Sequence, residues 1–590
     1  MPTRHHRAIK KLGSDPFFRR PDRTISKQNF GLTLFFSFVC RPHRLFIKQN
    51  RGLTPLFWRV LALAAVFGAG AAAAQNVTVD SGRLEGVRLA NGVNAWYGIP
   101  YAAAPVRELR WRETQPAAPW SGVLHADRKG PECIQLLRRK DINHYFGEEA
   151  TSEDCLFMNV WAPAAARAKA KKLPVIVFIH GGGFTVGSSG MALYGGPNVA
   201  ARGAVFVNFN YRLGILGFMA HPELTAESPH RASGNYGFLD QVQTLRWVQR
   251  NIARFGGDPA NVTIAGQSAG GASVVSLVAS PLARGLFQRA FVQSGPAIGG
   301  ASPTLAESEQ TGLDVQKAVG ATSLAAMRQL PADRVFVVQR DFQFGDSGSV
   351  NVRPNIDGYF LPDSIANIFA AGRQNDVPTL AGFTRDDISP SPLRLAKTAA
   401  DYADKARQVY GANAERFMAL YPVSADADAP AMGKLAARHA MMEKGTRKLA
   451  QAQTASGKAP VYVYMFSRVH PFNPAAPLFD APQGAYHTSD VPYWFQTQDA
   501  LNMFKPTRLW GQQDRALSAR MMDSMLAFAR SGNPATPAIP WPAWRRGDEQ
   551  IIDFGDKVEV ARQNAAQLDF HDVPAQFVPA GAVVPRLTRD

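Results

Sequence analysis

Apolar runs of strand length alternate with helical patterns along residues 156–466. These runs are "LFMNVWAP" (156–163), "LPVIVFIH" (173–180), "AVFVNFNYR" (204–212), "NVTIAGQS" (261–268), "RAFVQSG" (289–295), "VPTLAGF" (377–383) and "APVYVYMF" (459–466). A helix is expected over 238–256, where one face carries Leu239, Val242, Leu245, Val248 and Ile252. Strands alternating with helices predict an α/β fold with a mainly parallel sheet. Such sheets bind ligands at the carboxyl ends of their strands.

The first 74 residues, called the leader below, have the features of a targeting segment and are not expected to be part of this fold. Residues 51–74 combine Arg51 and Arg59 with an apolar run from Val60 and a series of alanines ending at Ala74. This is the pattern of a signal peptide, with cleavage expected after Ala74. An uncleaved anchor is the alternative, although the run from Val60 to Ala74 is short for a membrane span. We interpret residues 1–50 as a basic extension, either disordered or a mis-called translation start.

The charge of the chain is concentrated in that leader. The formal net charge is +18, and residues 1–75 hold thirteen Lys or Arg against two Asp, which leaves +7 for the other 515 residues. No basic helix or interleaved aromatic stretch follows, so nucleic-acid binding is not expected. With 46% hydrophobic residues, positions 75–590 are expected to form one large globular domain.

Cysteine content also fits an exported chain. Cys40 lies in the leader, while Cys133 and Cys155 stand 22 positions apart in a loop-rich stretch. Two cysteines in an exported chain suggest one disulfide, and two reduced buried thiols are the alternative. Neither belongs to a C-x-x-C motif or lies near a histidine cluster, so no metal site is expected.

A single serine between glycines marks the end of one predicted strand. In "VTIAGQSAGG" (262–271), Ser268 lies between Gly266 and Gly270, where a strand is expected to turn into a helix starting at Ala269. A nucleophile on such a tight turn needs small neighbours, and the helix N-terminus favours developing negative charge. A packing turn with a solvated serine is the alternative. The motif therefore makes Ser268 a candidate nucleophile.

Three consecutive glycines follow another predicted strand. In "VIVFIHGGGFTVG" (175–187), they leave backbone N–H groups uncovered by side chains. Amides of this kind can stabilise a carbonyl oxygen as it becomes negative. We expect the amides of Gly182, Gly183 and Ala269 to form an oxyanion hole. A flexible surface turn is the alternative, but it would not explain the buried strand before the glycines.

A serine nucleophile requires a histidine base and an acid that orients the base. Four histidines lie late enough in the chain. His439 falls in a helical pattern, and His571 in an irregular tail near the C-terminus. His470 precedes Pro471, and His487 lies in the loop "GAYHTSDVPYWF" (484–495). The residues alone leave His470 and His487 level.

Six segments, in this order, resemble the type-B carboxylesterase/cholinesterase family of α/β-hydrolases. They are "WYGIPYAAAPV" (96–106), "SEDCLFMNVWAP" (152–163), "HGGGF" (180–184), "NYRLGILGF" (210–218), the block 234–273 around Ser268, and "FARSGNP" (528–534). The resemblance implies an α/β-hydrolase fold with large insertions that form a substrate gorge. It also implies that His487 is the catalytic histidine and that Cys133 pairs with Cys155.

The acid departs from the family pattern. The family usually has a Glu followed by Gly in a stretch similar to G-x-N-x-x-E-G. Here "GFTRDDIS" (382–389) has Asp387 at that position, followed by Ile388, and Asp386 is the alternative acid. Gln267 also replaces the Glu common before the nucleophile in relatives. This site therefore differs from the usual family site in two ways: Asp387 has a shorter side chain than Glu, and Gln267 lacks the negative charge of Glu.

The sequence therefore predicts a secreted or periplasmic serine hydrolase that acts on small carboxylic esters. Ser268, His487 and Asp387 are expected to work through an acyl-enzyme, without cofactor or metal. A monomer is expected, with no membrane span in the mature chain. The alternatives are a non-catalytic interaction protein resembling neuroligins, and an amidase or lactonase with the same triad.

Overall fold

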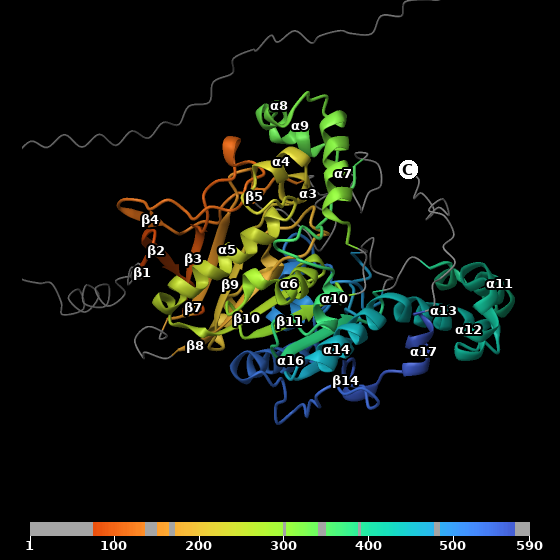
Figure 1. The fold of residues 1–590 in the computed structure, drawn as a ribbon. Coiled ribbons are helices and arrows are strands. Elements are labelled where there is room, and N and C mark those ends of the chain that lie inside the picture. The colour runs from red at the N-terminus through yellow and green to blue at the C-terminus, as the bar shows by residue number, and fades with distance from the viewer. Residues whose placement is uncertain are drawn as a thin grey trace, which may run out of the picture. The chain divides into compact units, whose positions relative to one another are not determined.

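A mostly parallel β-sheet forms the centre of the described chain (Figure 1). The computed structural model describes residues 75–135, 150–164, 172–298, 302–339, 350–387, 391–476 and 484–572. The predicted basic extension (1–50) and signal peptide (51–74) lie outside these residues.

The sheet has thirteen strands in the described residues. Their order is β1-β2-β3-β7-β9-β8-β10-β11-β12-β13-β14-β15, with β4 paired to β2, and β5 and β6 form a separate two-stranded sheet. The strands are β1 (Gln75–Val79), β2 (Gly82–Arg88), β3 (Val93–Pro100), β4 (Val123–His125), β5 (Glu132–Cys133), β6 (Thr151–Ser152), β7 (Phe157–Pro163), β8 (Leu173–Ile179), β9 (Val205–Phe209), β10 (Gly257–Gln267), β11 (Arg289–Gln293), β12 (Thr379–Thr384), β13 (Val461–Phe466), β14 (Gln550–Phe554) and β15 (Val558–Arg562).

Helices pack against the sheet and extend from it (Figure 1). They are α2 (Pro197–Ala201), α3 (Gly214–Phe218), α4 (Pro222–Glu227), α5 (Tyr236–Asn251), α6 (Ala269–Ala279), α7 (Leu305–Ala318), α8 (Leu324–Gln329), α9 (Ala332–Phe336), α10 (Ile365–Ala370), α11 (Ala399–Tyr410), α12 (Ala414–Leu420), α13 (Ala429–Arg438), α14 (Lys444–Ser456), α15 (Val491–Phe495), α16 (Gln512–Ser531) and α17 (Ala565–Phe570). Within the described ranges, none of the helices is long and apolar enough to cross a bilayer.

Successive residues of the central strands serve two different cores. In β8, Val175 and Val177 join a hydrophobic cluster with residues of α5 and α6. Ile176 and Phe178 between them join a second cluster with residues of α2, α15 and α16. Successive side chains of a strand point to opposite faces, so an uninterrupted apolar run is what a strand covered on both faces requires. The helices therefore shield both faces of the sheet.

All seven apolar runs of the sequence form strands, and the predicted parallel sheet is confirmed from β9 to β14. The outer strands differ, because β1, β2, β3 and β7 pair antiparallel in succession, and β15 pairs antiparallel with β14. The parallel core matters most for the site. The carboxyl ends of β8, β10 and β12 lie on one edge of the sheet, so the segments that follow these strands are brought together there.

Cys133 and Cys155 form a disulfide, and both are buried. The bond lies beside the short pairing of β5 with β6, in which Cys133 is opposite Ser152. It ties the end of β5 to the residues that lead into β7.

A polar cluster lies inside the helical group formed by α11, α12, α13 and α17. The Tyr421 hydroxyl lies 2.9 Å from His439 Nδ1 and 2.9 Å from His571 Nε2. His571 was expected in an irregular tail, but it is buried and directly follows α17. Burial lowers the pKa of His571 to about 4, helped by the charge of Lys444. The pKa of His439 falls to about 3, again through burial first and then through the charge of Arg438.

These histidines make the stability of the fold sensitive to acid. An unfolded histidine titrates near pH 6.5, so between about pH 6.5 and 4 the unfolded chain binds more protons than the folded chain. The free energy of unfolding should therefore fall as the pH falls through this window. His571→Gln should reduce that dependence by up to about one proton. Urea unfolding at pH 7 and pH 4.5 measures this, and an unchanged dependence in the variant would rule out His571 as a contributor.

Candidate active site

Ser268 occupies a strained turn between β10 and α6. Its backbone has φ 58° and ψ −122°, a conformation that non-glycine residues rarely adopt. A Cβ added to Gly266 would lie 2.3 Å from the Gly270 carbonyl oxygen, and one added to Gly270 would lie 2.0 Å from the Ile179 carbonyl oxygen. Glycine is therefore required on both sides of the serine by direct backbone contact.

Two backbone hydrogen bonds hold the turn in place. The Ser268 amide donates to the Gln293 carbonyl at 2.8 Å, and the Ser268 carbonyl accepts from the Ala272 amide at 2.9 Å. The first bond fixes the turn to the end of β11, and the second fixes it to the first turn of α6. The strain at Ser268 is thus supported by the sheet and the helix together.

The glycine loop after β8 lies directly against this turn. A Cβ on Gly181 would come within 2.7 Å of the Gln267 carbonyl oxygen and 3.0 Å of Ser268 Cβ. Gly182 and Gly183 have φ angles of 114° and 61°, which glycine adopts readily. Among the described residues, the amides of Gly182, Gly183 and Ala269 donate to no protein group.

Asp387 and His487 are in contact at the same edge of the sheet. His487 Nδ1 lies 2.5 Å from Asp387 Oδ2, although the residues are 100 positions apart. Asp387 follows β12, and His487 lies in the loop before α15. The imidazole is about one-third exposed, whereas the carboxylate is 8% exposed. The alternative acid is engaged elsewhere, because Asp386 Oδ2 accepts from Arg385 Nη2 at 2.8 Å and from the Ala485 amide at 2.7 Å.

The pKa of His487 is raised above its ordinary value. Desolvation lowers this pKa, but the charge and hydrogen bond of Asp387 outweigh it, and the charge of Asp490 adds to them. Asp490 was not predicted, although it stands only three residues after the histidine. Its carboxylate is fully buried, and Oδ2 accepts from Tyr464 and from Trp494. A second carboxylate therefore contributes to the charge around the imidazole.

Ser268 and His487 are not hydrogen-bonded to each other in this structure. Instead, the Gln267 side-chain amide nitrogen lies 3.1 Å from His487 Nε2. An amide nitrogen can only donate, so Nε2 is the acceptor, and the ring proton is on Nδ1, facing Asp387. This is the tautomer in which Nε2 can accept a proton from a neighbouring hydroxyl. The contact of Gln267 with His487 joins residues far apart in the sequence and was not predicted.

The other three histidines are engaged within the protein. His470 is buried, with Nε2 2.7 Å from the Ser489 carbonyl oxygen. His439 and His571 both contact Tyr421 in the helical group. Of the two histidines that the sequence left level, the structure places His487, rather than His470, against Asp387.

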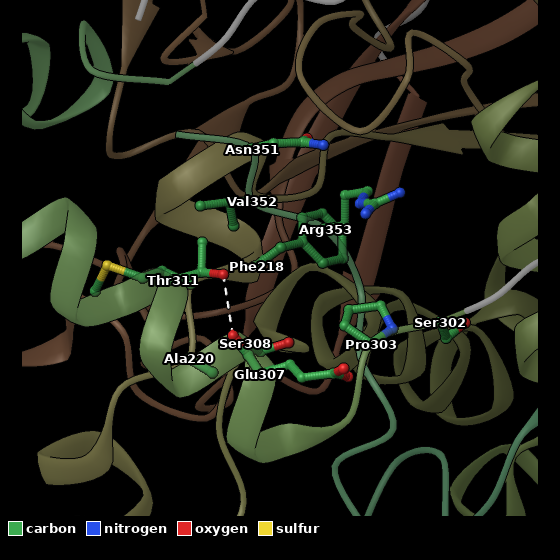
Figure 2. Close-up of a pocket in the computed structure, with 11 residues that line it drawn as sticks. Phe218, Ala220, Ser302, Pro303, Glu307, Ser308, Thr311, Asn351, Val352 and Arg353 are labelled. Carbon is green, nitrogen blue, oxygen red and sulfur yellow. Dashed lines mark hydrogen bonds between the residues drawn. The ribbon is translucent and has the colours of Figure 1, made fainter. Parts of the chain in front are cut away.

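A cavity of about 410 Å³ lies between α3, α7 and the segment 350–353 (Figure 2). Glu307 of α7 and Arg353 line it, and Thr311 donates a hydrogen bond to the Glu307 carbonyl at 3.1 Å. Phe218 in its wall packs edge to face on Phe184, the residue after Gly183, with ring centroids 5.1 Å apart. Ser268, Asp387 and His487 do not line this cavity. It borders the glycine loop through one aromatic ring and is separate from the predicted catalytic side chains.

Metal ligands do not gather at this edge of the sheet. In the part of the chain that the structure describes, no group of three or more His, Cys, Asp or Glu side chains is placed to hold a metal ion.

Comparisons with known proteins agree on one family. Residues 73–571 match the model of the carboxylesterase family. The chain is 35% identical over 492 residues to the fumonisin B1 esterase of Sphingopyxis macrogoltabida, covering 81% of this chain and 86% of that protein. It is 32% identical over 507 residues to the para-nitrobenzyl esterase of Bacillus subtilis (strain 168), covering 82% and 96%. A solved PNB esterase structure superposes with a TM-score of 0.69 at 30% identity, covering 85% of this chain and 99% of that one.

The contact between Gln267 and His487 predicts a measurable electrostatic effect. Gln267→Glu places a carboxylate beside the imidazole, which favours its charged form, so the pKa of His487 should rise further. NMR titration of protein with ¹⁵N-labelled histidine measures this, with Gln267→Leu as an uncharged control of similar size. An unchanged or lower pKa in Gln267→Glu would mean that this side chain does not face the imidazole.

Proposed function

Because the chain belongs to the carboxylesterase family and is a carboxylesterase-type hydrolase, we propose that it hydrolyses esters through Ser268, His487 and Asp387. The observation that carries the proposal is the 2.5 Å contact between His487 and Asp387 at the sheet edge that also carries the strained Ser268 turn. Nucleophile, acid and base follow β10, β12 and β13, respectively, in the order typical of this fold.

In the proposed first step, His487 Nε2 takes the hydroxyl proton of Ser268 as Oγ attacks the ester carbonyl carbon. The carbonyl oxygen becomes negative and is held by the amides of Gly182, Gly183 and Ala269. The tetrahedral intermediate then collapses. The bond to the alcohol oxygen breaks, that oxygen takes the proton from His487, and the acyl group remains on Ser268.

In the second step, water takes the place of the alcohol. His487 accepts a proton from the water, whose oxygen attacks the acyl carbon. Collapse of this intermediate releases the carboxylic acid and returns the proton to Ser268. Asp387 keeps the proton of the neutral imidazole on Nδ1 and stabilises the imidazolium that forms during both steps. Gln267 must release Nε2 before the first step, because the serine hydroxyl requires the same lone pair.

The raised pKa of His487 gives the proposed reaction a pH dependence. The base works only when neutral, so kcat/KM should fall as the pH falls through the pKa of His487.

The relatives' names refer to chemically different compounds, including fumonisin B1 and para-nitrobenzyl esters. Small carboxylic esters are therefore the substrate class that we propose, without choosing one member.

We also propose that the protein is exported, to the periplasm or outside the cell. The support is the leader pattern of residues 51–74 together with the disulfide between Cys133 and Cys155, a bond typical of oxidising compartments. Cell fractionation and N-terminal peptide mass spectrometry test this. A mature chain starting at Gln75 outside the cytoplasm is expected, whereas an intact leader on cytoplasmic protein would contradict export.

The catalytic proposal is tested by hydrolysis of p-nitrophenyl acetate, butyrate and octanoate. Ser268→Ala and His487→Ala should each lose at least about 10³-fold in kcat. Asp387→Asn should lose up to about 10⁴-fold, because the histidine tautomer is no longer fixed. Asp386→Asn is the matched control, because an amide oxygen can still accept from Ala485, and it should stay within a few-fold of the parent. Full activity in Ser268→Ala would contradict the mechanism.

A further inference from the structure

Arg508 is buried, and among the described residues it has no carboxylate partner. Its side chain is among the largest of the fully buried ones, and no described Asp or Glu forms an ion pair with it. Nη1 donates to Thr507 Oγ1 and Nη2 donates to the Tyr486 hydroxyl, both at 2.9 Å. The guanidinium also lies 5.0 Å from the ring centroid of Phe472. A buried cation is costly unless its donors are satisfied, and these neutral contacts satisfy part of that requirement.

The contact with Tyr486 begins a hydrogen-bonded chain that runs in one direction. Tyr486 accepts from Arg508 through its hydroxyl oxygen, which lies 3.3 Å from His470 Nδ1. His470 Nε2 lies 2.7 Å from the Ser489 carbonyl oxygen, which can only accept, so Nε2 carries the proton.

The protonation state of His470 shows which group donates in its hydrogen bond with Tyr486. Burial, and then the charge of Arg508, lowers the pKa of His470 to about 3, so the ring is neutral near pH 7. In a neutral ring with the proton on Nε2, Nδ1 must accept, and Tyr486 is its donor. The chain therefore runs from Arg508 to Tyr486, then to His470, and ends at the Ser489 carbonyl.

Two members of this chain, Tyr486 and Ser489, belong to the loop that carries His487. Tyr486 directly precedes the catalytic histidine, and Ser489 follows it by two residues. The Ser489 amide donates to the Tyr486 carbonyl at 3.0 Å, which closes a tight turn. Inside the turn, Thr488 has a φ of 79°, a strained value for a β-branched residue. A strained conformation persists only where the surrounding contacts fix it.

We propose that Arg508, acting through Tyr486 and His470, is a positioning residue that holds the 486–489 turn so that His487 stays aligned with Asp387 and Ser268. This inference rests on the proposed catalytic role of His487. Arg508 touches neither Ser268 nor His487, so its effect reaches the reaction only through the backbone of the turn. The chain of bonds joins three segments, at 470, 486–489 and 508, into one support.

The sharpest test removes one hydroxyl and keeps the ring. Tyr486→Phe breaks the chain at its centre, and Tyr493→Phe is the matched control. Tyr493 is also buried and contacts the His470 ring, but its hydroxyl donates to Asp514, outside the chain. Tyr486→Phe should lower kcat for p-nitrophenyl butyrate by about 10- to 100-fold with KM within about twofold. Tyr493→Phe should keep both within about twofold.

A second readout needs no substrate. The proton between His487 Nδ1 and Asp387 should give a downfield ¹H resonance in the parent, and this signal should shift or broaden in Tyr486→Phe but not in Tyr493→Phe. Arg508→Lys, which keeps the charge and loses the forked donor, should give an intermediate kcat. Unchanged kcat and an unchanged resonance in Tyr486→Phe would overturn the inference. If the parent hydrolyses no ester, the proposed function fails, and the resonance still decides the positioning role.

Discussion

The whole site depends on the close approach of three backbone segments at the end of β10. The Gly270 position has room for no side chain, because a Cβ there would lie 2.0 Å from the Ile179 carbonyl at the end of β8. The same approach brings Gly181 against Ser268, and so places the glycine loop beside the serine. The parallel pairing of β8 with β10 sets this arrangement, and the positive φ of Ser268 is its local consequence. Sheet topology and backbone sterics therefore place the candidate nucleophile and its candidate oxyanion donors before any side-chain contact is made.

The charged and polar side chains around His487 determine the pKa of its imidazole once the backbone is in place. Asp387 is in direct contact with His487, and Asp490 adds a buried negative charge that also raises the pKa of the imidazole. Gln267 presents an uncharged amide to the other ring nitrogen. A neutral residue at this position limits how far the pKa of His487 can rise, which keeps the imidazole available as a base at lower pH. The departures from the family pattern at 267 and 387 thus fall on the two residues in contact with the histidine ring.

The sequence predicted the parts of this arrangement that depend on local pattern. Seven apolar runs became strands, and the glycines around Ser268 and after Ile179 stand where short local motifs place them. The choice between His470 and His487 could not be made from residue patterns, since both lie in loops with aromatic neighbours. That choice depends on which loop the sheet carries to the end of β12, which is a property of the tertiary fold. Of the strands with antiparallel partners, β7 was predicted, whereas β1, β2, β3 and β15 were not, because polar residues or glycines interrupt their apolar positions.

Contacts between residues far apart in the chain could not be predicted from the sequence. Nothing in the residues around Arg508 indicates that its guanidinium reaches Tyr486, because the link passes through packing of loops 22 positions apart. His571 was expected in an irregular tail, and its burial next to Tyr421 depends on the packing of α17 against α12. Polar residues whose partners lie far along the chain show their roles only when the fold is known.

We propose that Ser268 faces amides arranged to hold a negative oxygen. A crystal structure of the protein after reaction with a small alkyl fluorophosphonate tests this most directly. We predict phosphorus bonded to Ser268 Oγ, with one phosphonyl oxygen about 2.7–3.1 Å from the amide nitrogens of Gly182, Gly183 and Ala269. An adduct on another residue, or a phosphonyl oxygen that points away from these amides, would contradict the proposed nucleophile or the proposed oxyanion hole.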